Sequence, residues 1–82
     1  MMNREEVKKR LEKIYQEVFD DESIMLEENM TSDDIEQWDS ITNLRLIMQI
    51  EKTFGIKFTT AEMKNMKNVG ILINLVFDKT NR

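Results

Sequence analysis

The 82-residue sequence contains neither cysteine nor histidine. Without cysteine, disulfide bonds and thiolate metal sites are excluded, so the packing of the core has to supply the stability. The lack of cysteine also fits a reducing compartment. Cysteine and histidine serve in much nucleophilic and acid–base catalysis, and without them the chain has few groups for such chemistry.

Long apolar runs, proline and flexible linkers are missing as well. No stretch approaches the ~20 apolar residues of a membrane span, and the charged start is unlike a signal peptide. No repeat, low-complexity tract or Gly/Ser-rich linker indicates a piece of a larger array. We expect a free-standing, soluble, cytoplasmic monomer with one domain over residues 1–82, which buries about 60% of its surface or slightly more on folding.

Charge is unevenly distributed along the chain, whose net charge is −4. Residues 1–40 contain 13 acidic and 5 basic residues, and residues 41–82 contain 3 acidic and 7 basic ones. An acidic front half argues against nucleic acid as a partner, because binding there requires Lys and Arg to neutralise phosphates. It favours protein partners with basic surfaces.

The clearest helix prediction covers residues 40–54, which contain neither glycine nor proline and are rich in apolar residues. Asp39 and Ser40 stand where an N-cap belongs, and Gly55 stands where a left-handed C-cap belongs. From this position alone, Ser40 would be interpreted as a capping hydroxyl. The expected core stripe of this helix consists of Leu46, Ile47, Ile50 and Phe54.

Helical periodicity predicts three more helices. The first runs from about Arg4 to Phe19 with Asn3 as its cap, and Ile56-Lys57-Phe58 is an extended connector after the second. A short helix capped by Thr59 or Thr60 contains Ala61, Glu62, Met63 and Met66. The last helix, capped by Asn68, buries Val69, Leu72, Ile73, Val76 and Phe77 and frays from Lys79 to Arg82. The prediction is an all-α bundle of three main helices and one short third helix, with a long first loop.

That loop, residues 20–39, is called the acidic loop below. It holds nine acidic residues and no basic one. We expect its apolar residues to pin it to the bundle, with a short helical turn near Ser32 to Glu36. These apolar residues are Ile24, Met25, Leu26, Met30, Ile35 and Trp38. A calcium loop of the EF-hand type needs a central glycine, which is missing between Asp20 and Asp39, so a solvated acidic loop is the better interpretation.

The segment from Trp38 to Phe58, WDSITNLRLIMQIEKTFGIKF, resembles the acyl carrier protein family. In that family an Asp-Ser-Leu or Asp-Ser-Ile tripeptide opens the second helix. The Phe-Gly-Ile exit, the chain length and the long connection between the first two helices agree with the resemblance, which spans nearly the whole chain. It implies a four-helix bundle of the acyl-carrier-protein type and a carrier that catalyses nothing itself.

The resemblance also implies a covalent cofactor. Ser40 would carry 4′-phosphopantetheine, attached by a phosphopantetheinyl transferase from coenzyme A with magnesium. The thiol of this arm would hold acyl groups as thioesters for acyl-transferring or condensing enzymes. Asp39 matches the motif acid, which either helps to position the transferase's metal or partner, or caps the helix. A phosphodiester on Ser40 would lie at the positive end of a helix, where free N–H groups and the macrodipole favour an anion.

Four residues on the second helix share one face next to Ser40: Ile41, Arg45, Met48 and Lys52. In the resemblance, partner enzymes contact this face. Many fatty-acid-synthesis carriers have acidic residues where this chain has Arg45 and Lys52. The difference favours a dedicated pathway such as polyketide, nonribosomal peptide or surface-saccharide acylation over housekeeping fatty acid synthesis. The alternative is that both side chains are only solvated charges.

Two other functions remain open at this stage. An aminoacyl or peptidyl carrier would share the fold and Ser40, and would be recognised by an adenylating enzyme. A helical adaptor would bind basic partners through the acidic loop and carry no prosthetic group. We also expect the ring of Trp38 to be at least partly packed, so that it anchors the end of the acidic loop and presents Ser40 at a fixed position.

Overall fold

The computed structural model describes residues 2–35 and 37–81, and every regular element in these two ranges is helical. The elements are α1 (Arg4–Val18), the short 3-10 helix η1 (Ser32–Asp34), α2 (Ser40–Phe54), α3 (Thr60–Lys64) and α4 (Val69–Thr80). The all-α prediction is confirmed, as is the predicted order of three main helices and a short third one. The turn expected near residues 32–36 is η1, while Glu36 itself lies outside the described residues.

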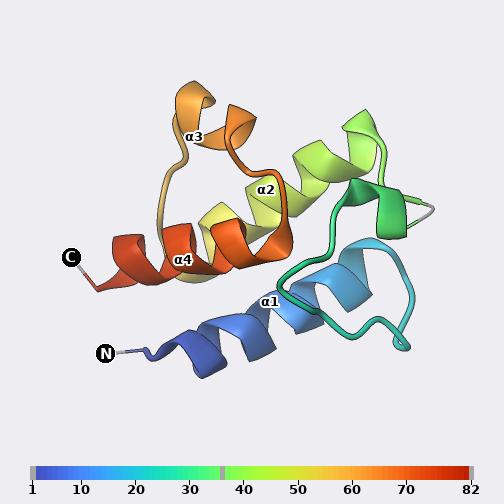
Figure 1. The fold of residues 1–82 in the computed structure, drawn as a ribbon, viewed down its shortest axis with the longest axis horizontal. Helices are drawn as coiled ribbons and strands as arrows, with labels where there is room; N and C mark the ends of the chain where they lie inside the picture. Colours follow the sequence, from blue (N-terminus) through green and yellow to red (C-terminus); the bar gives the residue numbers. More distant parts are fainter. Residues whose placement is uncertain (1, 36, 82) are drawn as a thin grey trace.

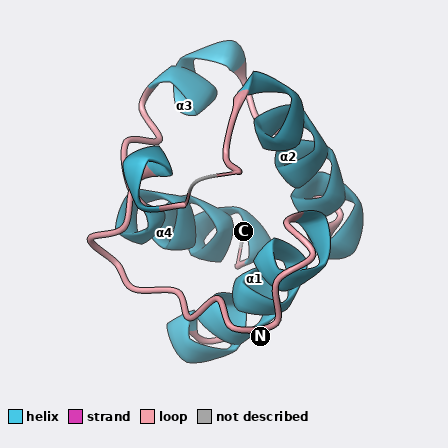
Figure 2. Cartoon of the chain, turned by 90° about the vertical axis from the view of Figure 1, so that its right-hand side faces the viewer, coloured by secondary structure: helices cyan, strands magenta, loops and turns pink. Residues whose placement is uncertain are grey.

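The bundle is assembled on α1, which packs against both α2 and α4. Figures 1 and 2 both show α3 on the side of the bundle away from α1, and α3 contributes no buried residue. The core between the three long helices is apolar and aromatic throughout. It consists of Val7, Leu11, Ile14, Tyr15, Phe19, Ile24, Leu26, Ile35, Leu46, Ile47, Ile50, Phe58, Val69, Leu72, Ile73 and Val76.

The predicted second helix agrees closely with α2. Leu46, Ile47 and Ile50 are buried as expected, whereas Phe54 is only half-buried against the core. Gly55 ends the helix with a φ of 67°, in the left-handed region where a side chain would be strained. The local capping pattern was therefore sufficient to locate both ends of this helix.

The short third helix was predicted too long. Thr59 is its cap, since Thr59 Oγ1 accepts the Glu62 N–H at 3.1 Å and Glu62 Oε1 accepts the Thr59 N–H at 2.8 Å. The helix ends at Lys64, and Met66 lies beyond it, half-buried against the core. Because the chain leaves the helix early, the Met66 side chain can reach the core from a non-helical segment.

The fraying predicted from Lys79 onward is wrong for the part of the tail that the structure describes. Helix α4 continues to Thr80, and Lys79 Nζ lies 2.9 Å from Glu62 Oε1 on α3. Asn81 Nδ2 donates to the Met2 carbonyl at 3.1 Å. The end of α4 is thus held by α3 and by the start of the chain, contacts that no local pattern indicates.

The acidic loop is fastened to α4 by backbone hydrogen bonds. Val69 N–H donates to the Met30 carbonyl at 2.9 Å, and Gly70 N–H donates to the Glu28 carbonyl at 2.8 Å. A Cβ on Gly70 would lie 3.1 Å from that carbonyl oxygen, so glycine permits the close approach. Of the apolar residues expected to pin the loop, Ile24, Leu26 and Ile35 are buried, Met30 and Trp38 are half-buried, and Met25 is exposed.

Candidate functional site

Ser40 is the first residue of α2 and is exposed, but it does not cap the helix. The cap is Asp39, whose Oδ1 accepts the N–H groups of Ile41 and Thr42, each at 2.9 Å. Thr42 Oγ1 returns the interaction by accepting the Asp39 N–H at 2.8 Å. The interpretation of Ser40 as a capping hydroxyl is therefore wrong, because Asp39 and Thr42 make the capping bonds between them.

The same bonds correct the expected role of the helix N–H groups. The N–H groups of Ile41 and Thr42 are already bonded to the Asp39 carboxylate and are not free to bind a phosphate. Hydrogen bonds from Thr42, with a smaller contribution from the charge of Arg45, hold the pKa of Asp39 below its ordinary value. An ionised carboxylate thus stands next to the Ser40 hydroxyl, and an anion on Ser40 would lie at the positive end of the helix macrodipole.

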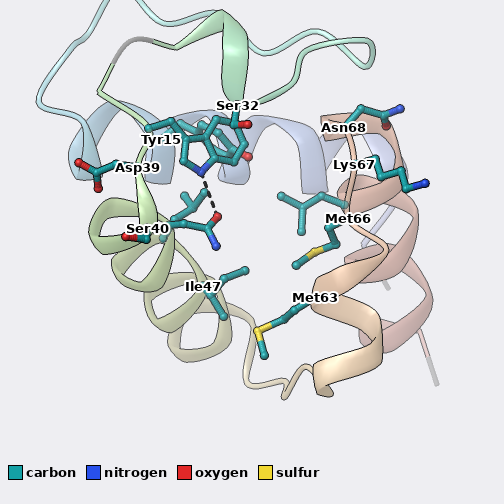
Figure 3. Close-up of a pocket in the computed structure, with 13 residues that line it drawn as sticks. Tyr15, Ser32, Asp39, Ser40, Ile47, Met63, Met66, Lys67 and Asn68 are labelled. Atoms are coloured by element: carbon teal, nitrogen blue, oxygen red, sulfur yellow. Dashed lines mark hydrogen bonds between the residues drawn. The ribbon is translucent and has the colours of Figure 1, made fainter.

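Trp38 is half-buried, so the prediction that its ring is at least partly packed is confirmed. Its indole meets the ring of Tyr15 edge-on, with centroids 5.3 Å apart, and the ring of Phe19 at 5.9 Å. The indole Nε1–H donates to Asn43 Oδ1 at 2.9 Å, which is the dashed line in Figure 3. The residue two positions before Ser40 is therefore tied to both α1 and α2.

A pocket of about 410 Å³ opens beside Ser40, within the size range of small-molecule sites. Figure 3 shows Ser40 and Ile47 on one side, with Met63 and Met66 on the other. Tyr15 of α1 and Leu72 of α4 contribute to the lining. Sequence analysis missed this pocket because its walls come from every helix, and only the high methionine content hinted at an adaptable apolar surface.

The face predicted for partner binding is exposed along its whole length. Ile41 is 67% exposed and Met48 is 60% exposed, and Arg45 and Lys52 are also exposed. Arg45, Met48 and Lys52 border a shallow hollow of about 480 Å³, together with Glu17 and Val18 of α1.

Leu44 was not predicted as part of this face. It is 60% exposed and follows Ile41 by three residues and precedes Met48 by four. That spacing places the three apolar side chains on one side of the helix, and the same spacing in the sequence could have revealed it.

The described residues show neither a metal site nor a membrane span. Within residues 2–35 and 37–81, no three acidic side chains lie close enough together to hold a metal ion. No helix in these ranges is long and apolar enough to cross a membrane.

Comparison with known proteins identifies the family. No family model and no curated protein matches the chain. A solved structure does match, namely the solution NMR structure of a holo acyl carrier protein from Geobacter metallireducens. The two sequences are 39% identical, the TM-score is 0.89, and the match covers 93% of this chain and 87% of the other. With this identity over nearly the full length of both, the chain belongs to the acyl carrier protein family.

Proposed function

We propose that Ser40 carries 4′-phosphopantetheine and that the chain delivers acyl groups, held as thioesters on the thiol of that arm, to partner enzymes. The observation that carries this proposal is the position of Ser40 in a relative of a holo acyl carrier protein. Its hydroxyl is exposed at the start of α2, and the capping bonds of that helix do not involve it. A modifying enzyme can therefore reach the hydroxyl without disturbing the helix.

The other serines fit this role less well. The chain contains Ser23, Ser32 and Ser40. The hydroxyl of Ser23 donates to the Asp21 carboxylate within the acidic loop, and Ser32 lies in the three-residue helix η1. Neither begins a long helix, whereas Ser40 begins one of 15 residues that presents exposed apolar side chains directly after it.

The test is the intact mass after incubation with a promiscuous phosphopantetheinyl transferase, coenzyme A and magnesium. The wild type is expected to gain the mass of phosphopantetheine, and Ser40→Ala is expected to gain nothing. Ser32→Ala is the matched control, because Ser32 lines the same pocket and its loss should leave the mass gain intact. A wild type that gains no mass, or a Ser40→Ala variant that still gains it, would refute the assignment.

We further propose that cognate enzymes bind the α2 face formed by Ile41, Leu44, Arg45, Met48 and Lys52. Exposed apolar side chains flanked by two cations support this assignment, because such a face can bury apolar area while its charges select the partner. The two cations also support a dedicated pathway, such as polyketide, nonribosomal peptide or surface-saccharide acylation, rather than housekeeping fatty acid synthesis. The expected native partner presents basic groups to the acidic loop and acidic or neutral groups to α2.

A further inference from the structure

The last three residues of the acidic loop are bonded to the first turn of α2. Thr42 Oγ1 donates to the Gln37 carbonyl and accepts the Asp39 N–H, each at 2.8 Å. The indole Nε1–H of Trp38 donates to Asn43 Oδ1 at 2.9 Å (Figure 3). The segment that leads into α2 is therefore attached at three points to the residues that follow it.

The bond to Asn43 spans Ser40 and takes no part in capping the helix. It joins the residue two positions before Ser40 to the residue three positions after it. Because an indole can only donate, the amide oxygen of Asn43 has to face the ring, and this fixes the orientation of the amide. Asn43 is exposed, and its side chain forms no other hydrogen bond with the described residues. The bond to Trp38 is thus the contribution of this side chain that a substitution would remove.

The packing of Trp38 does not by itself set the direction of its N–H. The half-buried ring contacts Tyr15 at a centroid distance of 5.3 Å and Phe19 at 5.9 Å. Aromatic rings pack favourably in several relative orientations, whereas a hydrogen bond requires the N–H to point at its acceptor. The bond to Asn43 therefore selects one orientation of the indole, and with it one path of the chain into Ser40.

We infer that Asn43 is a positioning residue for the modification of Ser40, because through Trp38 it holds the chain in the arrangement that the modifying enzyme binds. This inference rests on the proposed attachment. In that reaction the Ser40 oxygen bonds to the phosphorus of coenzyme A that bears the pantetheine. The bond from this phosphorus to the bridging oxygen breaks, adenosine 3′,5′-bisphosphate leaves, and the hydroxyl proton passes to a base of the enzyme. Such a transfer requires the attacking oxygen to be aligned with the phosphorus.

The experiment measures the kinetics with which a promiscuous phosphopantetheinyl transferase, supplied with coenzyme A and magnesium, modifies the protein. Asn43→Ala removes the acceptor, while the higher helix propensity of alanine offsets part of the lost stability. A chain that adopts the competent arrangement only part of the time binds with lower apparent affinity, but reacts normally once bound. We therefore expect Asn43→Ala to raise KM roughly two- to tenfold, the factor that one net hydrogen bond supplies, and to leave kcat unchanged.

Asn74→Ala is the matched control. Asn74 is also an exposed helical asparagine whose Oδ1 accepts one side-chain bond, from Arg4 Nε at 2.9 Å, but it does not line the pocket beside Ser40. This variant should keep the wild-type KM. Asn43→Asp retains an acceptor oxygen and should also keep it, at a salt concentration that screens the added charge. In a Trp38→Phe background, which has no indole N–H, Asn43→Ala should change KM no further.

The bond itself can be followed in the unmodified protein without the transferase. Trp38 is the only tryptophan, so its indole N–H gives a single resonance in an NMR spectrum. This N–H should exchange with deuterium more slowly in the wild type than in Asn43→Ala, because only the wild type bonds it to an acceptor within the chain.

The inference is overturned if Asn43→Ala keeps the wild-type KM, if Asn74→Ala raises KM as much, or if Asn43→Asp fails to restore it. It is also overturned if the effect of Asn43→Ala persists in Trp38→Phe, or if the indole N–H exchanges equally fast in both proteins. A wild type that takes up no phosphopantetheine removes the proposed attachment and this inference together. Modification of the wild type and Asn43→Ala with equal KM removes this inference alone.

Discussion

Replacing Gly70 with alanine tests how firmly the acidic loop is held against α4. In an exposed helix interior, Gly→Ala stabilises a protein by up to ~1 kcal/mol, because alanine has the higher helix propensity. At Gly70 the new Cβ would lie 3.1 Å from the Glu28 carbonyl oxygen and 3.2 Å from the Glu28 Cβ. The carbonyl can move away only by lengthening the 2.8 Å hydrogen bond that it accepts from the Gly70 N–H.

The size of the effect follows from these contacts. Loss of that bond, and of the neighbouring bond from Val69 N–H to the Met30 carbonyl, removes ~1 kcal/mol for each. The gain in helix propensity offsets about half of this loss. Gly70→Ala should therefore lower the free energy of unfolding by ~1 kcal/mol, which corresponds to a midpoint lower by about 4–8 °C for a domain of this size. Thermal and urea unfolding curves, recorded by far-UV circular dichroism, measure the loss of stability.

Gly55 provides the matched control. A Cβ there would meet no atom within 4 Å, so a side chain is disfavoured only by the left-handed backbone, with its φ of 67°. Gly55→Ala should also destabilise, but Gly55→Asn should recover part of the loss, because asparagine tolerates the left-handed region. Gly70→Asn should show no such recovery, because its Cβ meets the same atoms. A Gly70→Ala variant that is more stable than the wild type would refute the argument and show that the loop moves aside freely.

Two further predictions concern charge. Arg45→Glu combined with Lys52→Glu should raise turnover by fatty-acid-synthesis enzymes and lower turnover by the native partner, with both effects shrinking as salt increases. Lys57→Glu with Lys64→Glu makes the same charge change elsewhere and is the control. If the Arg45 and Lys52 double variant matches the wild type with both enzyme sets at low salt, the two residues are only solvated charges. Hydrogen bonds and ion pairs lower the pKa of Glu28 and Glu62 below their ordinary 4.5 in the folded protein. These carboxylates therefore add stability above about pH 5 that is lost as the pH falls through their folded-state pKa; unfolding midpoints that stay constant from pH 6 to about pH 3 would contradict this.

The elements that could be predicted from the sequence are those with local signals. The start and end of α2 follow from Asp39 and Gly55, whose capping roles depend only on neighbouring residues. The buried positions Leu46, Ile47 and Ile50 follow from helical periodicity. The same stretch carries the family resemblance, so the position of Ser40 at a helix start was accessible from the sequence.

What the sequence did not reveal depends on contacts between distant segments. The role of Gly70 comes from Glu28, some forty positions earlier in the chain, and the extension of α4 comes from the pairing of Lys79 with Glu62. The lining of the pocket beside Ser40 combines residues of α2 with Tyr15 of α1 and Met66 from the segment after α3. Periodicity within one helix carries no information about such approaches.

Asp39 caps α2 and Ser40 does not, which has a consequence for any modification of the Ser40 hydroxyl. Because the bonds that start α2 belong to Asp39 and Thr42, attaching a group to the Ser40 oxygen breaks none of them. If Ser40 carries the arm as proposed, the unmodified chain is already a folded substrate for the modifying enzyme, and the modified chain keeps the same helix start. On that proposal, the arm could be attached and removed while the start of α2 stays intact, so one molecule could serve repeatedly without refolding.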